Sequence, residues 1–334
     1  MNIAINGFGR IGRAAFKILL ERTSRGKDLN IVGINDLGDS ENLAYLLKYD
    51  SVYGVYEKSV SFDDKNIVVN GKKYFLLSEK DPKNLPWGKL GVDVVFECTG
   101  IFKDREGAKM HLEAGAKKVV ISAPTKDETV KTYVIGSSHF ESKEDVISCA
   151  SCTTNSVTPV LSVMEKAFGV DKAMLTTVHA YTASQSIVDS PNKKDFRLGR
   201  AGAWNIIPSS TGAAKATAKA MPFLDSIFDG VSVRVPVACG SISDLTMLTK
   251  RNTSVDNVND VFIKAMEDPL YKNILKFTKA PIVSSDILKS PFSSIVDGLM
   301  TRVVGGNLVK IMAWYDNEWG YSNRLVDLGV YGKF

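Results

Sequence analysis

A cysteine at the expected start of a helix is the residue of this sequence best suited to covalent chemistry. Cys152 follows the segment 145–148, and apolar residues at helical spacing come after it: Val157, Val160, Leu161, Met164 and Phe168. A thiol in the first turn of a helix faces unpaired backbone N–H groups and the positive end of the helix dipole, and both favour the thiolate. We therefore expect Cys152 to be a nucleophile, beside hydroxyls of Ser151, Thr153 and Thr154 that can cap the helix or bind an anion.

Two other interpretations of Cys152 are open at this point. Cysteine is among the most buried residue types, so Cys152 could be inert core. Cys149 and Cys152 also form a Cys-x-x-Cys pair, which could be a redox pair or half of a zinc site. A structural zinc site needs four ligands, usually in two close pairs, whereas Cys98, Cys239 and the three histidines stand singly in the sequence. We therefore expect no metal site.

His179 is the candidate base for this thiol. It ends an expected strand over 172–178, and it is followed by the small donors Tyr181, Thr182 and Ser184. A lone histidine is more often structural than catalytic, but a cysteine and a histidine on successive elements can form a thiolate–imidazolium pair. The donors that follow it suit an anion. We expect a base and an anion site at the end of this strand.

Two further features indicate anion binding in the second half of the chain. Arg234, in an expected strand over 231–237, is a cation of the type that binds phosphate bidentately, although it could also form an ordinary ion pair. The segment 208–212 supplies hydroxyls and a glycine N–H at the start of an expected helix over 213–220. Before it, the segment 188–204 is rich in lysine and arginine and predicts a long, ordered, basic loop.

Composition indicates a soluble globular protein. Its 334 residues exceed one average domain, so we expect two domains. Hydrophobic residues make up 44% and charged residues 24%, and no apolar run approaches the ~18 residues that would span a membrane. The sequence enters a strand pattern without a secretory signal, and its four cysteines suit a reducing compartment, so we expect a cytoplasmic protein. A net charge of +5 without a basic, aromatic-interleaved run does not indicate nucleic-acid binding.

The first residues carry a dinucleotide-binding pattern of strand, Gly-x-Gly-x-x-Gly and helix. After the expected strand 2–6, Gly7 allows a tight turn, Gly9 lets a pyrophosphate approach the backbone, and Gly12 allows close packing of helix on strand. Asp36 ends the next expected strand, at the distance where this fold places a carboxylate on the adenosine ribose. A carboxylate there repels a 2′-phosphate, so the pattern favours NAD over NADP, although an aspartate in a turn is also common.

Two further buried strands are expected over 92–97 and 118–122. Ligands lie across the carboxyl ends of parallel strands, so we expect cofactor contacts from the small or polar residues that end them, which are Thr99, Gly100, Ser122 and Ala123. The stretch 62–77 predicts instead antiparallel strands that turn at Asn70-Gly71 and decorate the sheet edge. Strands over 242–250, 295–303 and 308–315 give the second half a β-rich character, with a helix at its end.

Segments spread over the whole chain carry a family resemblance. They are Asn-Gly-Phe-Gly-Arg-Ile-Gly at 6–12, Ser-Cys-Thr-Thr-Asn at 151–155, Thr-Val-His-Ala-Tyr-Thr at 177–182, Ser-Thr-Gly-Ala-Ala-Lys at 210–215 and Tyr-Asp-Asn-Glu-Trp-Gly-Tyr at 315–321. With them the sequence resembles the glyceraldehyde-3-phosphate dehydrogenase family. The resemblance implies oxidation of D-glyceraldehyde 3-phosphate with NAD and inorganic phosphate to 1,3-bisphosphoglycerate and NADH, through a thioester on Cys152. It also implies a homotetramer with the loop 188–204 at a subunit interface.

The resemblance implies a role for each matching position. Cys152 would be the nucleophile and His179 its base, while Thr182 and Arg234 would hold the phosphate of the substrate. Inorganic phosphate would be held by Ser151, Thr153, Arg197, Thr211 and Gly212. The expected NAD contacts are Gly7, Gly9, Arg10, Ile11, Gly12, Asn35, Asp36, Lys80, Thr99, Ser122, Asn317 and Tyr321. Among these, Asn317 would fix the nicotinamide amide.

The resemblance completes the predicted fold class, which is α/β. An NAD-binding domain over 1–151 would contain a Rossmann-type doubly wound parallel sheet, and the helix over 318–334 would pack back on it. A catalytic α+β domain over 152–317 would contain a large, mostly antiparallel sheet.

The sequence departs from the family pattern at three positions. Ser156 stands where the family usually has cysteine and Cys149 where it has asparagine, so the second thiol has moved to the other side of the nucleophile. Ser190, before Pro191, replaces a leucine that helps NAD-specific members to exclude NADP. Two alternative functions are an erythrose-4-phosphate dehydrogenase, against which Thr182, Thr211 and Gly212 argue, and a non-catalytic NAD-binding redox sensor that uses the two neighbouring thiols.

Overall fold

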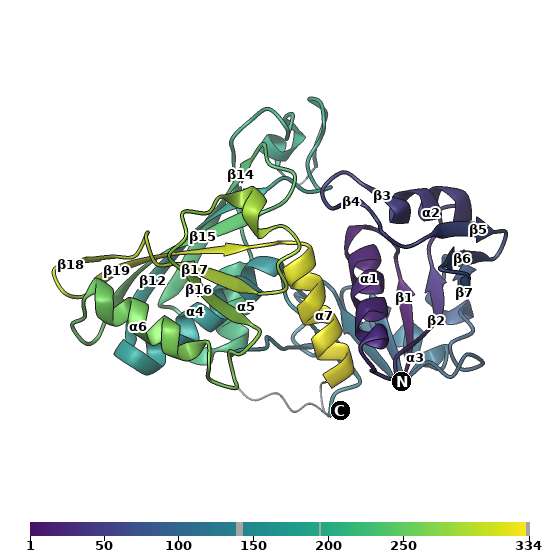
Figure 1. Cartoon of the computed structure of the whole chain (residues 1–334), viewed down its shortest axis with the longest axis horizontal. Coiled ribbons are helices and arrows are strands. Elements are labelled where there is room, and N and C mark those ends of the chain that lie inside the picture. Colours follow the sequence, from purple (N-terminus) through teal and green to yellow (C-terminus); the bar gives the residue numbers. More distant parts are fainter. Residues whose placement is uncertain (138–142, 194, 332–334) are drawn as a thin grey trace. The chain divides into compact units, whose positions relative to one another are not determined.

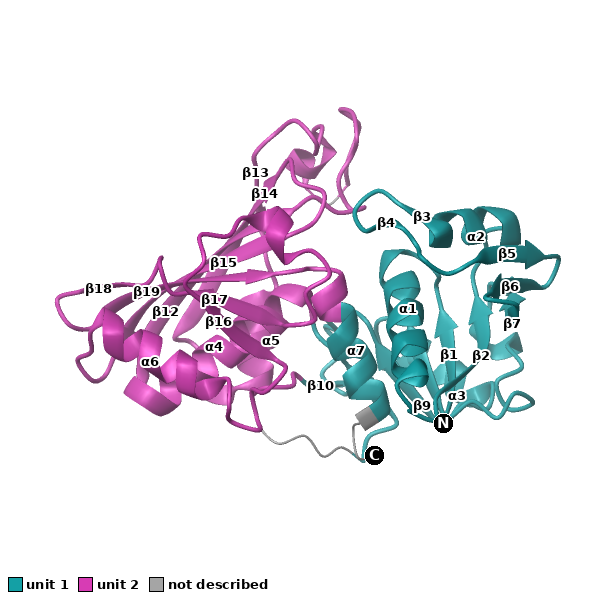
Figure 2. Ribbon diagram, viewed as in Figure 1, with its two compact units in different colours: residues 1–133, 140–150, 322–334 teal, residues 134–139, 151–321 magenta. Residues whose placement is uncertain are grey.

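The chain folds into two compact units. The computed structural model describes residues 1–137, 143–193 and 195–331 (Figure 1). Of these, 1–133, 143–150 and 322–331 form unit 1, and 134–137, 151–193 and 195–321 form unit 2 (Figure 2, teal and magenta). His139, Lys194 and the end of the predicted C-terminal helix (332–334) lie outside the described residues.

Unit 1 is built on one sheet with the strand order β10-β11-β9-β8-β1-β2-β7-β6-β5. All pairs from β10 to β7 are parallel, and the chain winds outward from β1 in both directions, which confirms the predicted doubly wound parallel sheet. The strands are β1 Asn2–Asn6, β2 Asn30–Asn35, β5 Val60–Asp63, β6 Asn66–Val69, β7 Lys72–Leu77, β8 Val94–Glu97, β9 Lys118–Ile121, β10 Lys131–Thr132 and β11 Val146–Ser148. The helices are α1 Arg10–Ser24, α2 Ser40–Lys48, α3 Arg105–Glu113 and a short 3₁₀ helix Pro82–Asn84, with a small separate pair β3 Tyr49–Asp50 and β4 Gly54–Val55.

The predicted hairpin extends one edge of this sheet. β6 and β7 are antiparallel and turn at Asn70 and Gly71, whose φ angles of 50° and 78° lie in the left-handed region. Asparagine and glycine tolerate this region, and the turn suits the twist of the flanking strands. β7 also pairs with β2 in parallel, so the hairpin joins the sheet at its edge, as expected.

The C-terminal helix α7, Trp319–Tyr331, contributes its residues from 322 onward to unit 1. Asp327 binds the Arg22 guanidinium of α1 at 2.6 Å and that of Arg324 at 2.6 Å. A Cβ at Gly329 would lie 2.1 Å from the Phe96 ring of β8, so only glycine permits this approach. The helix is therefore held on unit 1 by both ion pairs and close packing.

Unit 2 is built on a sheet with the strand order β13-β14-β12-β15-β19-β17-β16, and β18 pairs with β19. Only β12–β14 and β16–β17 are parallel among the pairs of the described residues, which confirms a mostly antiparallel sheet. The strands are β12 Val170–Ala180, β13 Ile207–Ser210, β14 Phe228–Val235, β15 Ser241–Thr249, β16 Leu275–Thr278, β17 Ser294–Asp297, β18 Arg302–Val304 and β19 Leu308–Tyr315. The helices are α4 Cys152–Phe168, α5 Ala213–Ala220, α6 Val255–Ala265 and the 3₁₀ helices Phe196–Gly199, Pro222–Leu224 and Ser284–Ile287.

Two elements of unit 2 differ from the sequence-based expectation. The single strand expected over 295–303 is divided, because Asp297 and Gly298 form a turn between β17 and β18 in which the Met300 N–H donates to the Asp297 carbonyl at 3.1 Å. Helix α6 was not predicted, although Ser254 caps it by accepting from the Asn257 N–H at 3.2 Å. Its buried residues join those of α4, α5 and the strands in one apolar core.

Candidate active site

Helix α4 begins at Cys152, as the sequence predicts. Ser151 is its N-cap, and the Ser151 Oγ accepts from the Thr154 N–H at 3.0 Å. Ala150 has a φ of 57°, a conformation that costs a residue other than glycine roughly 1–2 kcal/mol. The chain is extended again at Ser151, and the helix begins at the next residue, which carries the thiol.

The structure brings Cys152 and His179 into contact. The Cys152 Sγ lies 3.4 Å from the His179 Nε2. His179 is near the end of β12 and Arg234 is its direct neighbour in register on β14. The His179 Nδ1 lies 2.7 Å from the Ala180 carbonyl and 2.7 Å from the Arg234 Nη1, which also donates to that carbonyl at 3.1 Å.

These contacts decide what the imidazole can do. An Nδ1–H donates to the Ala180 carbonyl and leaves the Nε2 lone pair directed at the thiol, whereas an unprotonated Nδ1 accepts from Arg234 and leaves an Nε2–H for the sulfur. The first tautomer is that of a base for Cys152. Both tautomers keep the ring in one orientation, because both partners of Nδ1, the Ala180 carbonyl and Arg234, are fixed to β12 and β14.

The charge environment differs from the one expected from the helix start alone. Burial raises the pKa of the Cys152 thiol, and the Arg234 charge and the N–H groups of Thr153 and Cys152 offset this only in part. Burial, followed by the Arg234 charge, lowers the pKa of His179 to about 3, against a smaller opposite effect of its bond to Ala180. The pair is therefore a thiol and a neutral imidazole before substrate adds.

Arg234 has a feature that fits an anion. Its Nε is buried and has no hydrogen-bond partner among the described residues. A buried N–H without a partner carries a desolvation cost, which a phosphate oxygen would remove. The predicted co-ligand Thr182 lies in the loop after β12, where its hydroxyl contacts the Ser184 Oγ at 2.9 Å and its N–H donates to the Gln185 Oε1 at 3.2 Å.

Tyr315 is a residue of this site that the sequence did not reveal. Its hydroxyl lies 2.9 Å from the Thr153 Oγ1 and 2.8 Å from the Thr177 Oγ1. The Tyr315 and His179 rings also pack edge to face, with their centroids 6.0 Å apart. These contacts tie the first turn of α4 to β12, so they fix the thiol relative to the imidazole. Burial raises the pKa of the Tyr315 phenol, which therefore acts as a neutral donor and acceptor.

The residues expected to hold inorganic phosphate have separate partners. The Thr153 hydroxyl contacts Tyr315, and the Thr211 Oγ1 accepts from the Ala213 N–H at 3.1 Å. Gly212 is the N-cap of α5, and a Cβ there would meet no atom within 4 Å. The Arg197 guanidinium binds Asp195 at 3.2 Å. The start of α5 at Gly212 is therefore open, as expected. That Thr153, Arg197, Thr211 and Gly212 together bind one phosphate ion remains a prediction.

Asn317 is oriented by its carbonyl oxygen. The Asn317 Oδ1 accepts from the Gly240 N–H at 3.0 Å and from the Ser241 hydroxyl at 3.0 Å. Since both partners donate, the amide cannot be turned over without leaving two donors facing its NH₂ group. The Nδ2 is therefore directed away from them as a donor, which is the group that a nicotinamide carbonyl requires. Tyr321 is buried in the first turn of α7.

Unit 1 contains a cavity of about 750 Å³ at the carboxyl ends of β1, β2 and β8. Its walls include six of the expected cofactor residues, which are Gly7, Gly9, Asn35, Asp36, Lys80 and Thr99. Arg10, Ile11, Gly12 and Ser122 do not line it, and the Arg10 guanidinium binds Asp50 at 2.8 Å. The sequence missed its apolar walls, which are Leu37, Pro82, Ile101, Phe102 and Met110. Two of them, Leu37 and Ile101, are exposed to solvent. Exposed apolar side chains in a cavity wall are expected where a planar base binds.

The Gly-rich turn fits a dinucleotide. A Cβ at Gly12 would lie 2.0 Å from the Gly7 carbonyl oxygen, so this position in the first turn of α1 can be occupied only by glycine. A Cβ at Gly9 would meet no atom within 4 Å, and among the described residues no side chain caps α1 at this N-cap. The Asp36 carboxylate accepts from the Phe8 N–H at 2.6 Å and from the Gly38 N–H at 2.9 Å. An open helix start beside a fixed carboxylate suits pyrophosphate and ribose.

A dinucleotide-binding unit, together with a unit that holds a thiol beside an imidazole, fits the class of nicotinamide-dependent dehydrogenases. Comparison with known families agrees: the family described as "Glyceraldehyde 3-phosphate dehydrogenase, NAD binding domain" matches residues 1–105, and that described as "Glyceraldehyde 3-phosphate dehydrogenase, C-terminal domain" matches residues 151–317. The chain belongs to the glyceraldehyde 3-phosphate dehydrogenase family. Its first unit is an NAD-binding domain, and the protein is an NAD-dependent oxidoreductase.

Relatives named glyceraldehyde-3-phosphate dehydrogenase match over nearly the full chain. That of Streptomyces coelicolor is 50% identical over 334 residues, which cover 99% of this chain and 98% of the relative. That of Borreliella burgdorferi is 51% identical over 336 residues, 98% of each chain, and that of Thermotoga maritima is 50% identical over 327 residues, 97% of each. None of the described helices has the length and apolar content that a membrane crossing requires. In the same residues, no three His, Cys, Asp or Glu side chains gather as metal ligands would.

Proposed function

We propose that this protein catalyses the phosphorylating oxidation of D-glyceraldehyde 3-phosphate to 1,3-bisphosphoglycerate in glycolysis and gluconeogenesis, with NAD and inorganic phosphate. The observation that carries the proposal is the 3.4 Å contact between the Cys152 Sγ and the His179 Nε2, with Arg234 on the other ring nitrogen. This contact supplies a nucleophile, its base and a phosphate ligand within one hydrogen-bonded group. Thr182 joins Arg234 as the second ligand of the substrate phosphate in this proposal.

The first step forms a bond between sulfur and carbon. The Cys152 thiol gives its proton to the His179 Nε2 as the sulfur attacks the aldehyde carbon. The carbonyl oxygen becomes the oxyanion of a hemithioacetal, and the backbone N–H groups at the start of α4 are donors for it. When bound, NAD supplies the acceptor for the hydride that then leaves the substrate carbon. Asp36, Thr99 and Asn317 would hold that cofactor.

The second step releases the acyl group. Loss of hydride converts the hemithioacetal to a thioester on Cys152. An oxygen of inorganic phosphate, held by Ser151, Thr153, Arg197, Thr211 and Gly212, attacks the thioester carbon, and the sulfur leaves as a thiolate. Both anions are then bound beside the reacting carbon, so the attack has the advantage of an oriented intramolecular reaction. The thiolate takes back the proton that His179 has held since the first step, and the proton of the attacking phosphate is released to solvent. The products are the acyl phosphate and a restored cysteine.

A rapid-mixing experiment without phosphate tests this scheme. The enzyme, NAD and the aldehyde should release NADH in a burst of about one equivalent per active site, because the thioester accumulates. Addition of phosphate should restore continuous turnover. Absence of the burst, or full turnover to the free acid without phosphate, would contradict the acyl-enzyme scheme. Equal rates with erythrose 4-phosphate would favour that alternative substrate, and no turnover with either aldehyde would favour a redox sensor.

Cofactor preference gives a separate prediction. The Asp36 carboxylate lies in the wall of the cavity, held by two backbone N–H groups, so a 2′-phosphate beside it meets a fixed like charge. We expect kcat/KM to favour NAD over NADP by about 100-fold, since a screened like-charge contact costs a few kcal/mol. Asp36→Gly with Leu37→Arg should admit NADP, and Ser190→Leu in that background should lower its use again. Equal use of both cofactors by the unaltered protein would show that the carboxylate does not decide the choice.

Assembly and location complete the proposal. In the loop 188–204 and next to it, five large apolar residues are each at least 70% exposed: Ile187, Val188, Phe196, Trp204 and Ile206. Apolar surface of this kind is typical of a protein interface, and it supports a homotetramer in which this loop is an interface. Sedimentation would give the mass of the assembly. A cytoplasmic location is supported by four cysteines that form no disulfide, and cell fractionation would test it.

A further inference from the structure

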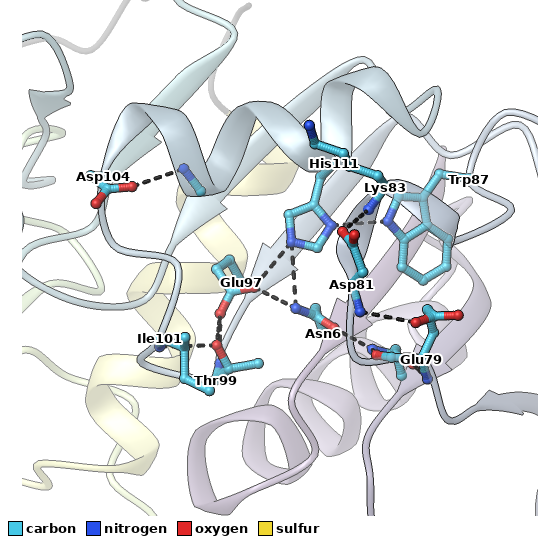
Figure 3. A network of polar contacts seen from close by, with 12 residues as sticks. Asn6, Glu79, Asp81, Lys83, Trp87, Glu97, Thr99, Ile101, Asp104 and His111 are labelled. Atoms are coloured by element: carbon cyan, nitrogen blue, oxygen red, sulfur yellow. Dashed lines mark hydrogen bonds and ion pairs between the residues drawn. The ribbon is translucent and has the colours of Figure 1, made fainter.

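A row of polar side chains crosses the carboxyl ends of three neighbouring strands beneath the unit 1 cavity. Glu97, Asn6 and Asn35 end β8, β1 and β2, and they are direct neighbours in the sheet register. All three are buried, with Glu97 only 1% exposed. The Asn6 Nδ2 donates to the Glu97 Oε2 at 2.5 Å, and the Asn35 Nδ2 donates to the Asn6 Oδ1 at 2.7 Å. Figure 3 shows Glu97 beside Asn6 and His111.

The other side of Glu97 is occupied by a histidine whose tautomer is fixed. The Trp87 indole N–H donates to the His111 Nδ1 at 3.0 Å (Figure 3). Because an indole nitrogen can only donate, this Nδ1 carries no proton and the ring is neutral, with its proton on Nε2. That Nε2–H donates to the Glu97 Oε2 at 3.1 Å. His111 is completely buried, so this arrangement is closed to solvent.

The second carboxylate oxygen controls the loop that follows β8. The Glu97 Oε1 accepts from the Thr99 N–H at 2.8 Å and from the Thr99 hydroxyl, and this hydroxyl accepts from the Ile101 N–H at 3.0 Å. Thr99 and Ile101 line the cavity, and a Cβ on Gly7 would lie 2.7 Å from the Thr99 nitrogen. The position of Thr99 therefore determines the shape of one wall of the cavity, and it also determines how closely Gly7 of the Gly-rich turn can pack against β8 and the loop that follows it.

Glu97 does not line the cavity itself. Four donors converge on its two oxygens: the Asn6 amide, the His111 Nε2–H and the N–H and hydroxyl of Thr99. A carboxylic acid would place its own proton against one of them, so the set fits an ionised carboxylate balanced by neutral donors. We propose that Glu97 is a positioning residue for cofactor binding, whose buried negative charge fixes Asn6 and the Thr99–Ile101 loop in the conformation that NAD requires.

The first test is Glu97→Gln. The amide has the same shape but turns an NH₂ group toward one pair of donors, so Asn6 or Thr99 must move. We expect the dissociation constant of NAD, measured by titration calorimetry, to rise by about 10-fold to 100-fold, the cost of an unmatched buried hydrogen bond. At saturating NAD, kcat should change by less than about threefold, because Cys152 and His179 are unaltered. Wild-type affinity for NAD in this variant would overturn the proposal.

A paired substitution separates positioning from simple loss of stability. Asn6→Asp combined with Glu97→Gln moves the carboxylate by one hydrogen bond. At position 6 it can accept from the new amide, from Asn35 and from the His111 Nε2, which lies 3.4 Å from the present Asn6 Nδ2. We expect NAD affinity within about threefold of wild type, far above that of either single variant. A folded pair that binds NAD as weakly as Glu97→Gln alone would overturn the proposal.

Two further variants complete the design. Asp93→Asn is the matched control: Asp93 accepts from the Asn2 N–H at 2.8 Å at the opposite end of β1 and β8, so its loss should lower the melting temperature and leave NAD affinity unchanged. Thr99→Val keeps the side-chain volume and removes one donor to Glu97. Because Thr99 also lines the cavity, the contact with Glu97 is tested by comparing the effect of Thr99→Val in the unaltered protein with its smaller expected effect in the Glu97→Gln background. Thr99→Val should weaken NAD binding severalfold, and unchanged affinity would contradict the proposal. The proposal rests on NAD binding alone, so a protein that binds NAD but does not oxidise the aldehyde would refute only the proposed function.

Discussion

Replacement of Cys152 by serine is expected to lower turnover by at least about 10⁴-fold, the scale found when a covalent nucleophile is removed. An alcohol is far harder to ionise than a thiol, and His179 can no longer generate the attacking anion. The serine hydroxyl occupies nearly the same volume and can keep the contact with the imidazole. The fold, the melting temperature and the affinity for NAD should therefore be unchanged. Formation of NADH in the presence of phosphate is the measurement.

Cys149→Ala is the control for this experiment. Cys149 is buried at the end of β11, where its N–H donates to the Ile121 carbonyl at 3.0 Å, and no step of the mechanism requires its thiol. The alanine variant should keep its activity after a small loss of stability for the truncated side chain. A folded but inactive Cys149→Ala, or an active Cys152→Ser, would revive the interpretation of the two thiols as a redox pair.

His179→Asn is expected to slow hydride transfer and the alkylation of Cys152 together, each by about 10²-fold or more near neutral pH. The physical reason lies in the two pKa shifts. The thiol pKa lies above its ordinary value and that of the imidazole is lowered to about 3, so between these limits the pair holds one proton whatever the pH. A thiolate then arises by transfer of that proton to the Nε2, and the alkylation rate of the unaltered enzyme should be nearly flat from about pH 5 to pH 8.

In the His179→Asn variant, the rate of Cys152 alkylation should increase with pH. Without the imidazole, the thiolate forms only by loss of a proton to solvent. Since the pKa of the thiol is raised, the alkylation rate should increase about tenfold for each pH unit across this range. Reaction with iodoacetamide, followed by loss of activity or by mass, measures both profiles. A wild-type profile as steep as that of the variant would show that His179 is not the base.

Features set by a few consecutive residues could be predicted from the sequence. Ser151 before a helical apolar pattern places Cys152 at a helix start, and the structure has the helix begin there. The same holds for the Gly-rich turn after β1 and for Asn70-Gly71 in the hairpin, because each depends on local φ preferences. Asp297-Gly298 is a turn signal of the same kind. Apolar residues on both sides of it extend the strand pattern, so the strand expected over 295–303 runs across this turn.

Features set by distant residues could not be predicted in this way. The contact of Tyr315 with Thr153 joins positions 162 residues apart, and nothing in either segment indicates the other. The bonds that connect Trp87, His111 and Glu97 likewise depend on the packing of α3 against the sheet. The pKa of Cys152 depends on how far the surrounding chain buries the thiol. The helix start alone favours the thiolate, whereas burial raises the pKa and favours the thiol.

The division of labour between the two units has a consequence for how such an enzyme can change during evolution. Cys152, His179 and Arg234 belong to unit 2, and the residues that line the nucleotide cavity belong to unit 1. One of the points where the chain passes from unit 1 to unit 2 lies between Ala150 and Ser151, one residue before the proposed nucleophile Cys152. A recombination event at that point of the gene would transfer Cys152 together with its proposed base His179 and its proposed phosphate ligand Arg234, and the C-terminal helix α7 would be transferred with them. Preference for one cofactor or another can thus change, or be exchanged between lineages, without disturbing the residues proposed to form and break the covalent bond.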